Sequence, residues 1–265
     1  MNDETARGLA LGTGARASAI STSALAYNPA ALALGHLYHI EGVVDYIPQL
    51  HTVALGGAVV DSSTSKIGAG VGLRGFLSGT DGVGGIDGRI GLALPFSDAV
   101  SLGLSGRYLN LKSDTKLGTG GTASKTLAQG FTMDAAFRVQ PSQIFQLELA
   151  TLNFIDLGSS YAPLYLATSA GISLGEVVNI GADLLVDTSS FKKADYTAGG
   201  GIELLVANVL PLRVGYAVNT QRQLHTVSGG LGYTDKLVGF DLSLQQQVSG
   251  GDATRVIGSL RYFVH

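Results

Sequence analysis

The sequence has 265 residues, and its 38 glycines are roughly twice the usual share of about 7%, whereas charged residues make up only 14%. The formal net charge is −3 and there is no cysteine, which excludes a nucleic-acid partner, a disulfide framework and a Cys-ligated metal. Hydrophobic residues reach 45% and the mean hydropathy is +0.29, yet no run approaches the ~18 apolar residues of a membrane helix. This composition leaves a large β-sandwich or a β-barrel whose outer face contacts lipid.

The first 34 residues do not alternate between apolar and polar positions. Two alanine-rich stretches, 12–19 and 23–32, fit short helical turns, and Asn28-Pro29 favours a turn. Residues 1–5 are acidic and lead into no apolar region, so they do not form a secretory signal peptide. If the protein is exported, we expect its signal to have been removed.

From about Gly35 onward the pattern has a period of two residues, as β-strands require. In 131–139, for example, apolar residues occupy every second position, with Thr132, Asp134 and Arg138 between them. Fourteen segments fit this pattern: 36–46, 51–61, 66–78, 85–95, 99–112, 127–139, 142–153, 162–174, 176–187, 194–207, 210–219, 224–234, 236–247 and 253–264.

The connections between these segments alternate in length. One set is tight, such as Gly175-Glu176, and the other is generally longer and more polar, with 112–126 as its longest loop. Short turns at one rim and longer loops at the other are typical of an outer-membrane barrel, and strands of about 9–11 residues suit a tilted membrane strand. We therefore predict an all-β, fourteen-stranded antiparallel up-and-down transmembrane β-barrel. A soluble sandwich is the alternative, because alternation marks any half-buried sheet.

The two faces of the predicted strands differ in chemistry. The apolar face is expected to contact lipid, and seven tyrosines on it are candidates for interfacial girdles or are simply apolar filler: Tyr38, Tyr46, Tyr108, Tyr196, Tyr216, Tyr233 and Tyr262. The inward face is small and polar, with seven arginines and six acids: Arg74, Arg89, Arg107, Arg138, Arg213, Arg255, Arg261, Asp87, Asp134, Glu148, Asp183, Glu203 and Asp241. Their near-balance predicts a network of ion pairs, since an unpaired interior charge is costly; an aqueous ion path is the alternative.

Gly199, Gly200 and Gly201 are the most concentrated glycines of the inward face. They indicate a tightly curved strand or, as the alternative, a kink that opens the wall.

The sequence contains no catalytic constellation. His36 and His39 are three residues apart, which places them on opposite faces of a strand rather than around a metal. The glycines of 79–85 lack the Lys-Ser/Thr of a phosphate loop. We predict no enzymatic activity, no metal and no cofactor.

Two short motifs in the first 34 residues carry a family resemblance. Gly14-Ala15-Arg16-Ala17 and Asn28-Pro29-Ala30-Ala31-Leu32 resemble the start of the FadL-type outer-membrane transporters and the related PorV-type barrels, with Ala31 at the usual glycine. The resemblance implies that residues 1–34 form a plug, or hatch, on the periplasmic side of a barrel of residues 35–265. It assigns the plug motif to Gly14, Ala15, Arg16, Asn28, Pro29 and Ala30.

The resemblance also implies a place and a function. The aromatic end Arg261-Tyr-Phe-Val-His265 resembles a barrel-insertion signal, so we expect a bacterial outer-membrane location among lipid. Passive uptake of small hydrophobic or amphipathic compounds through a lateral wall opening is the first expected function, although the long external loops of the family are missing. The alternative is a structural or docking barrel that binds other proteins in an envelope secretion or motility machine. A simple ion-conducting porin comes third.

Overall fold

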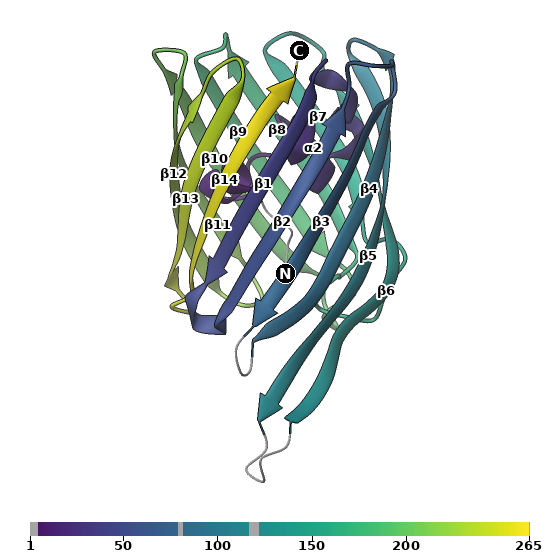
Figure 1. Cartoon of the computed structure of the whole chain (residues 1–265), viewed down its shortest axis with the longest axis vertical. Helices are drawn as coiled ribbons and strands as arrows, with labels where there is room; N and C mark the ends of the chain where they lie inside the picture. Colours follow the sequence, from purple (N-terminus) through teal and green to yellow (C-terminus); the bar gives the residue numbers. More distant parts are fainter. Residues whose placement is uncertain (1–4, 79–81, 117–121, 265) are drawn as a thin grey trace.

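Fourteen antiparallel strands form one closed barrel in the computed structural model, which describes residues 5–78, 82–116 and 122–264 (Figure 1). Each strand pairs with its sequence neighbours, and β1 pairs with β14 to close the wall. The predicted fourteen-stranded barrel is confirmed, and the sandwich is wrong. The strands are β1 Tyr38–Ile47, β2 Thr52–Asp61, β3 Gly68–Ser78, β4 Val83–Ser97, β5 Val100–Lys116, β6 Thr122–Val139, β7 Phe145–Leu152, β8 Tyr165–Leu174, β9 Val178–Asp187, β10 Asp195–Val206, β11 Leu210–Asn219, β12 Leu224–Thr234, β13 Val238–Ser249 and β14 Thr254–Val264.

Helices are short and lie mainly near the N-terminus. They are α1 Ala6–Ala10, α2 Ser21–Tyr27, and the 3₁₀ helices η1 Pro29–Leu34 and η2 Pro48–Leu50. In Figure 1 the purple helices of the first 34 residues are surrounded by the strands, and α1, α2 and η1 contact inward-facing residues of the wall. Within the described ranges, no helix is both long and apolar enough to cross a membrane.

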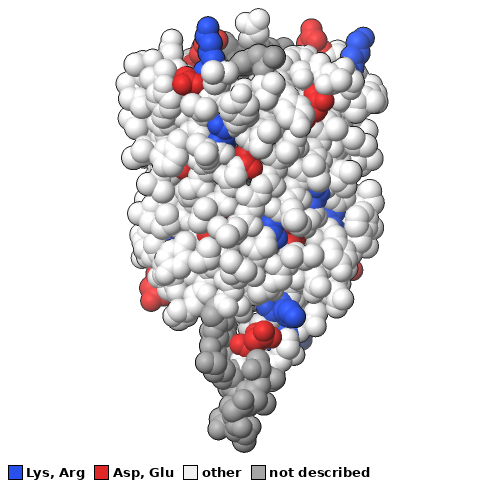
Figure 2. All heavy atoms as spheres, in the orientation of Figure 1, with Lys and Arg blue, Asp and Glu red and all other residues white. Residues whose placement is uncertain are grey.

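Along most of the wall, buried side chains, many of them polar, alternate with exposed apolar side chains. In β4, Arg89 is 9% exposed while its neighbour Ile90 is 59% exposed. Because successive strand residues point to opposite faces, the outer face is covered by side chains such as Leu73 and Leu260, both at least 60% exposed. Most of the visible outer surface carries neither charge type, and much of the charge lies near the two rims (Figure 2). A water-exposed surface rarely carries so large an apolar area, so the wall is suited to lipid.

Connections at the two rims differ as expected, with one correction. The turns at the rim where β1 starts and β14 ends are short; between β10 and β11, for example, Ala207 and Asn208 take positive φ angles of 51° and 60°, as tight hairpins require. At the other rim, 112–126 was predicted as a loop, but strand pairing continues to Lys116 and Thr122. The β5–β6 hairpin thus extends well beyond the barrel as a two-stranded ribbon (Figure 1).

Six of the seven outward tyrosines are more than 40% exposed, and Tyr38 is half-buried. Tyr38 and Tyr262 lie near the short-turn rim, and Tyr46 and Tyr196 lie near the other. This distribution suits two aromatic girdles, each with an apolar ring and a hydroxyl that reaches water.

Candidate functional site: the barrel interior

The N-terminal segment, residues 5–34, contacts the inner wall in two halves. In the first half, Ser243 Oγ donates to the carbonyl oxygen of Ala6 at 2.7 Å, and Ser228 Oγ donates to that of Ala10 at 3.2 Å. Gly14 lies directly against the backbone of Gly181. This half therefore packs on β9 to β13, and hydroxyl groups of the wall donate hydrogen bonds to the backbone of the segment.

The second half packs on the opposite part of the wall, from β1 to β6. Arg89 Nη1 donates to the carbonyl oxygens of Leu25, at 3.2 Å, and Ala26, at 2.6 Å. Pro29 lies against Gly103, where any side chain would overlap its backbone. A charged wall residue thus satisfies carbonyls near the end of α2, where intrahelical partners run out.

Residues of the two sequence motifs meet in the middle of this segment. Asn28 Nδ2 donates to the carbonyl oxygen of Arg16 at 3.1 Å, and Arg16 Nη1 donates to the carbonyl oxygen of Tyr27 at 2.7 Å. Arg16 also reaches the wall, because its backbone N–H donates to Asp183 Oδ2 at 3.3 Å and its Nε lies 3.9 Å from the same oxygen. The motif residues therefore join the halves of the segment to each other and to β9.

Charged side chains of β1 to β6 and β14 form compact ion pairs inside the wall. Asp87 accepts Arg107 through both carboxylate oxygens. Asp45 pairs with Arg255 at 2.6 Å and with Arg74 at 3.5 Å. In addition, Arg89 lies 3.7 Å from Asp134. Each of these side chains at least approaches an opposite charge.

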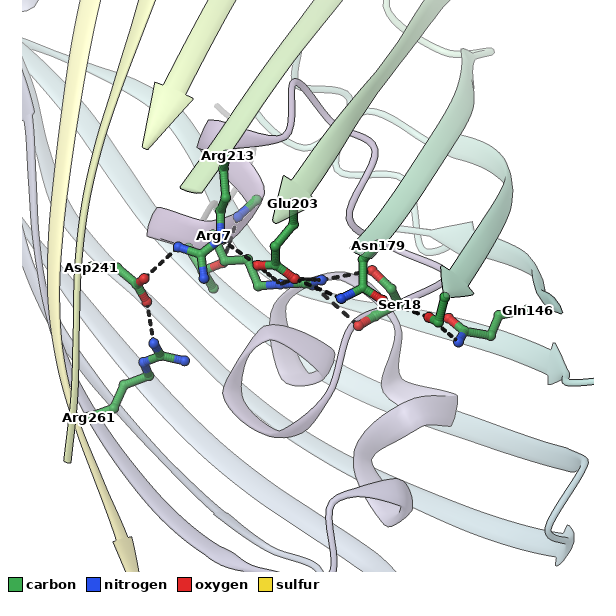
Figure 3. Close-up of polar contacts among 11 residues, drawn as sticks. Arg7, Ser18, Gln146, Asn179, Glu203, Arg213, Asp241 and Arg261 are labelled. Carbon is green, nitrogen blue, oxygen red and sulfur yellow. Dashed lines mark hydrogen bonds and ion pairs between the residues drawn. The ribbon is translucent and has the colours of Figure 1, made fainter. Parts of the chain in front are cut away.

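A continuous belt of polar contacts runs around the other side of the interior (Figure 3). Arg213 bridges Glu203 and Asp241, and Asp241 also pairs with Arg261 at 2.6 Å. Asn179 Nδ2 donates to Glu203 Oε1 at 3.1 Å, which extends the belt toward β8. We call these five residues, together with Ser173 and Gln146 beyond Asn179, the polar belt.

The first half of the N-terminal segment docks on this belt through Arg7. Its Nη2 lies 3.0 Å from Glu203 Oε1, and the same guanidinium donates to the carbonyl oxygen and hydroxyl of Ser18. Both side chains of the ion pair are almost buried, with 12% and 10% exposure. Figure 3 shows Arg7 and Arg213 approaching Glu203 together.

Two of the predicted network residues lack an ion pair in the described part of the chain. Arg138 and Glu148 are register partners on β6 and β7, but Arg138 Nη2 donates to Gln140 instead, at 2.8 Å. Both carboxylate oxygens of Glu148 are buried without a hydrogen-bond partner. The remaining predicted network residues each have at least one opposite charge within 4 Å.

A cavity of about 920 Å³, lined by both polar and apolar side chains, lies at the short-turn rim. It is lined by turn residues such as Asp98, by Ser18 to Ser21 of the N-terminal segment, and by Arg7 and Glu203. We call it the vestibule. It brings solvent to the belt and to the junction between the halves of the segment.

At the opposite end, the part of the interior beside β2 to β6 is apolar. Phe76, Leu109 and Leu111 point inward and are at most 7% exposed, and they form one cluster with Ala54, Val83, Ala128 and Ala162, against which Leu127, Leu157 and Tyr161 pack. Leu157, Tyr161 and Ala162 of this cluster belong to the β7–β8 loop, 153–164. This loop therefore folds into the long-loop end, and we call these ten residues the apolar cap.

Strand pairing in the wall is interrupted beside the apolar cap, and not at Gly199–Gly201. β10 pairs continuously with β9 and β11 through all three glycines, so they form no opening there. The absence of side chains at Gly199 and Gly201 instead admits the backbone of Leu11 and Gly12. By contrast, β6 pairs with β7 only over Ala135–Val139, and residues 122–132 of β6 have no strand partner on that side among the described residues.

Several interior residues escaped the sequence interpretation. Glu41 and Asp45 are 5% and 2% exposed and point inward from β1, and their alternation with Ile40 and Val44 was a usable signal. Arg7 and Asn153 gave no such signal. Asn153 accepts from Arg107 and its backbone N–H donates to Asp134 at 2.7 Å, so it fixes the start of the 153–164 loop.

Among the residues that the structure describes, no three His, Cys, Asp or Glu side chains are grouped to hold a metal ion. His39 Nδ1 shares a hydrogen bond with Ser21 Oγ, and His36 lines the vestibule.

Comparison with known proteins gives matches in structure only. No protein-family profile and no curated protein sequence match the chain. The Pseudomonas putida toluene transporter TodX is similar with a TM-score of 0.69 and 14% identity, over 99% of this chain and 98% of that chain. The Ralstonia pickettii toluene transporter TbuX gives 0.67 and 13%, over 99% and 98%. A Pseudomonas aeruginosa FadL homologue gives 0.67 and 12%, over 98% and 97%.

At these identities the comparisons establish the fold. The chain has the same fourteen-stranded barrel architecture as FadL-type proteins over nearly its whole length. The PorV-type part of the resemblance stays a prediction.

Proposed function

We propose that this protein is an outer-membrane barrel for passive uptake of small hydrophobic or amphipathic compounds. The apolar cap is the observation that carries the proposal: buried apolar side chains of β2 to β6 and of the 153–164 loop gather at the long-loop end of the interior. Apolar lining with few polar groups is what a site for an apolar compound requires. The similarity in fold to structures named as toluene transporters supports it.

The passage begins at the long-loop rim and ends at the wall beside β6. An apolar compound enters by displacing Leu157 and Tyr161, which pack on the cap from the 153–164 loop. It leaves sideways where β6 runs past the end of β7, because there the wall is closed by a loop and not by a strand ladder.

Residues 5–34 act as the plug in this proposal. Their two-sided packing fills the middle of the barrel, so a polar solute meets the segment before it can cross. The short-turn rim with its vestibule faces the periplasm, and the β5–β6 ribbon projects to the outside. Lipid covers the apolar outer wall, and no enzymatic step is involved.

Uptake of a monoaromatic hydrocarbon into proteoliposomes tests this function. Leu157→Ala should accelerate uptake by loosening the cap, and deletion of residues 1–30 should raise permeability to polar solutes. Leu164→Ala is the matched control, since Leu164 is a half-buried leucine of the same loop outside the cap. If neither the wild type nor the deletion variant transports any tested apolar compound, the proposal fails.

A docking barrel in an envelope machine is the second candidate. The observation that favours it is the tight packing of the segment, in which Gly103, Gly181 and Gly201 contact its backbone directly. Such packing suits a rigid scaffold. This function predicts stoichiometric co-purification with other envelope proteins, and isolation only as a lone monomer would contradict it.

A further inference from the structure

One row of inward side chains, on β7, β8 and β9, brings two carboxyl groups and a hydroxyl group with unmet hydrogen bonds next to one another. Strand register places Glu148 on β7 opposite Ser169 on β8, and Ser169 opposite Asp183 on β9. Directly opposite residues of adjacent strands have Cβ atoms about 4.5–5.5 Å apart. The serine hydroxyl therefore lies between two carboxyl groups.

These three side chains present four buried oxygens without a hydrogen-bond partner. They are Oε1 and Oε2 of Glu148, Oγ of Ser169 and Oδ1 of Asp183. Glu148 is 1% exposed, and Ser169 and Asp183 are each 4% exposed. Buried polar atoms are satisfied in the great majority of cases, and each exception calls for an explanation such as an ion or an ordered water.

Glu148 has no ion pair in direct contact, and Arg16 and Arg138 act on it only from beyond 4 Å. Asp183 has Arg16 at 3.9 Å, on its other oxygen Oδ2. Arg138, the register partner of Glu148, lines the vestibule and donates to Gln140. No ion pair within 4 Å joins Glu148 to any residue of the described chain, and an isolated buried carboxylate costs several kcal/mol.

We propose that Glu148, Ser169 and Asp183 bind one small monovalent cation, sodium. Hard cations take carboxylate and hydroxyl oxygens as ligands, and four such oxygens converge from three neighbouring strands. One unit of positive charge at the site would compensate Glu148 in direct contact, which neither Arg16 nor Arg138 provides. A divalent ion would leave surplus positive charge near Arg16 and Arg138, so a monovalent ion fits better.

The cation would act on the wall and on the N-terminal segment together. It bridges β7, β8 and β9, and Asp183 is the residue that holds Arg16 of the plug motif. Binding therefore stabilises the wall where the segment docks. The site stands on these contacts alone and does not depend on what the barrel transports.

Heat unfolding of the whole barrel in detergent, in sodium chloride against N-methylglucamine chloride at equal ionic strength, tests the proposal. Sodium should raise the wild-type unfolding temperature by roughly 5 °C when it is about a hundredfold above its dissociation constant. Glu148→Gln should abolish this shift, because it removes the charge. Ser169→Ala keeps both carboxylates and should reduce the shift, which keeps the test decisive if Glu148→Gln does not fold. Glu176→Gln, in the exposed β8–β9 turn, should retain the full shift.

Crystals soaked in thallium(I), which replaces alkali cations and scatters anomalously, locate the ion. A single peak among the three side chains supports the site. The proposal is overturned if the wild type unfolds at one temperature in both salts, or if the sodium shift survives in Glu148→Gln. An infrared band of a protonated Glu148 carboxyl at neutral pH would also overturn it, since a proton would then neutralise the group.

Discussion

Glu203 of β10 accepts two arginines at once, Arg7 from the N-terminal segment and Arg213 from the neighbouring strand β11. The two arginines contribute differently to stability, because the charges of the wall residues in the polar belt already balance without Arg7. Arg213 and Arg261 carry two positive charges that match Glu203 and Asp241. Arg7 adds a third positive charge, so its departure leaves Glu203 and Asp241 still ion-paired.

Substitution at these two arginines should therefore have unequal effects on stability. Arg213→Ala removes the bridge between two buried carboxylates, and breaking a buried pair from one side costs about 3–5 kcal/mol. Arg7→Ala loses hydrogen bonds while Glu203 keeps Arg213 and Asn179, so its cost should be about 1.5 kcal/mol. Urea unfolding of the barrel in lipid measures both free energies. Equal losses of unfolding free energy would contradict this, because they would show that Arg7 stabilises the polar belt as much as Arg213 does.

Gly181 should be intolerant of even one methyl group. A Cβ there would overlap the carbonyl oxygen of Gly14, so Gly181→Ala should push the N-terminal segment from β9 and destabilise the protein by about 1–3 kcal/mol. Limited proteolysis from the vestibule side should then cleave the segment faster. Gly42→Ala is the control, because nothing lies within 4 Å of a Cβ at that outward position. Unchanged cleavage of Gly181→Ala would mean that the segment has another way to fit.

The barrel was predictable because strand alternation is a local property. Each strand shows its two faces in its own sequence, as in β4 with Arg89 inward and Ile90 outward. Strand number and rim lengths follow from counting such segments. The β5–β6 hairpin was misjudged because Lys112, Ser113 and Asp114 are polar on both faces, as a ribbon beyond the membrane allows.

The interior contacts were less predictable because they join distant residues. Arg7 and Glu203 are 196 positions apart, and no local pattern pairs them. The role of Gly199–Gly201 likewise depends on a segment that packs from the other end of the chain. Part of β6 lacks a partner because β7 is short. β7 ends at Leu152, since the next residue, Asn153, turns inward and its N–H donates to Asp134.

Asp87 and Arg107 allow a direct test of how a buried pair contributes. Asp87→Asn keeps the shape but removes the negative charge that accepts Arg107 through both oxygens, and should cost about 3–5 kcal/mol. Replacing both, with Asp87→Asn and Arg107→Met, removes the positive charge as well and should recover a large part of that loss. Unfolding free energies of the two single variants and the double variant give the coupling. A double variant that loses as much as the sum of the singles would show that the pair is not coupled.

The β12–β13 turn should loosen in acid. The backbone N–H groups of Val238 and Leu237 donate to Asp235 Oδ1 at 2.8 and 2.7 Å, and these bonds hold the pKa of Asp235 below its ordinary value. A carboxyl whose folded pKa is lowered stabilises the fold above its unfolded pKa, which is about 3.9 for Asp. That stabilisation is lost as the pH falls through the lower folded value. Hydrogen exchange at the Leu237 and Val238 amides should therefore show less protection at low pH than at neutral pH, after correction for intrinsic rates. In Asp235→Asn the protection should no longer depend on pH in this range, and a persistent dependence would assign the effect to another group.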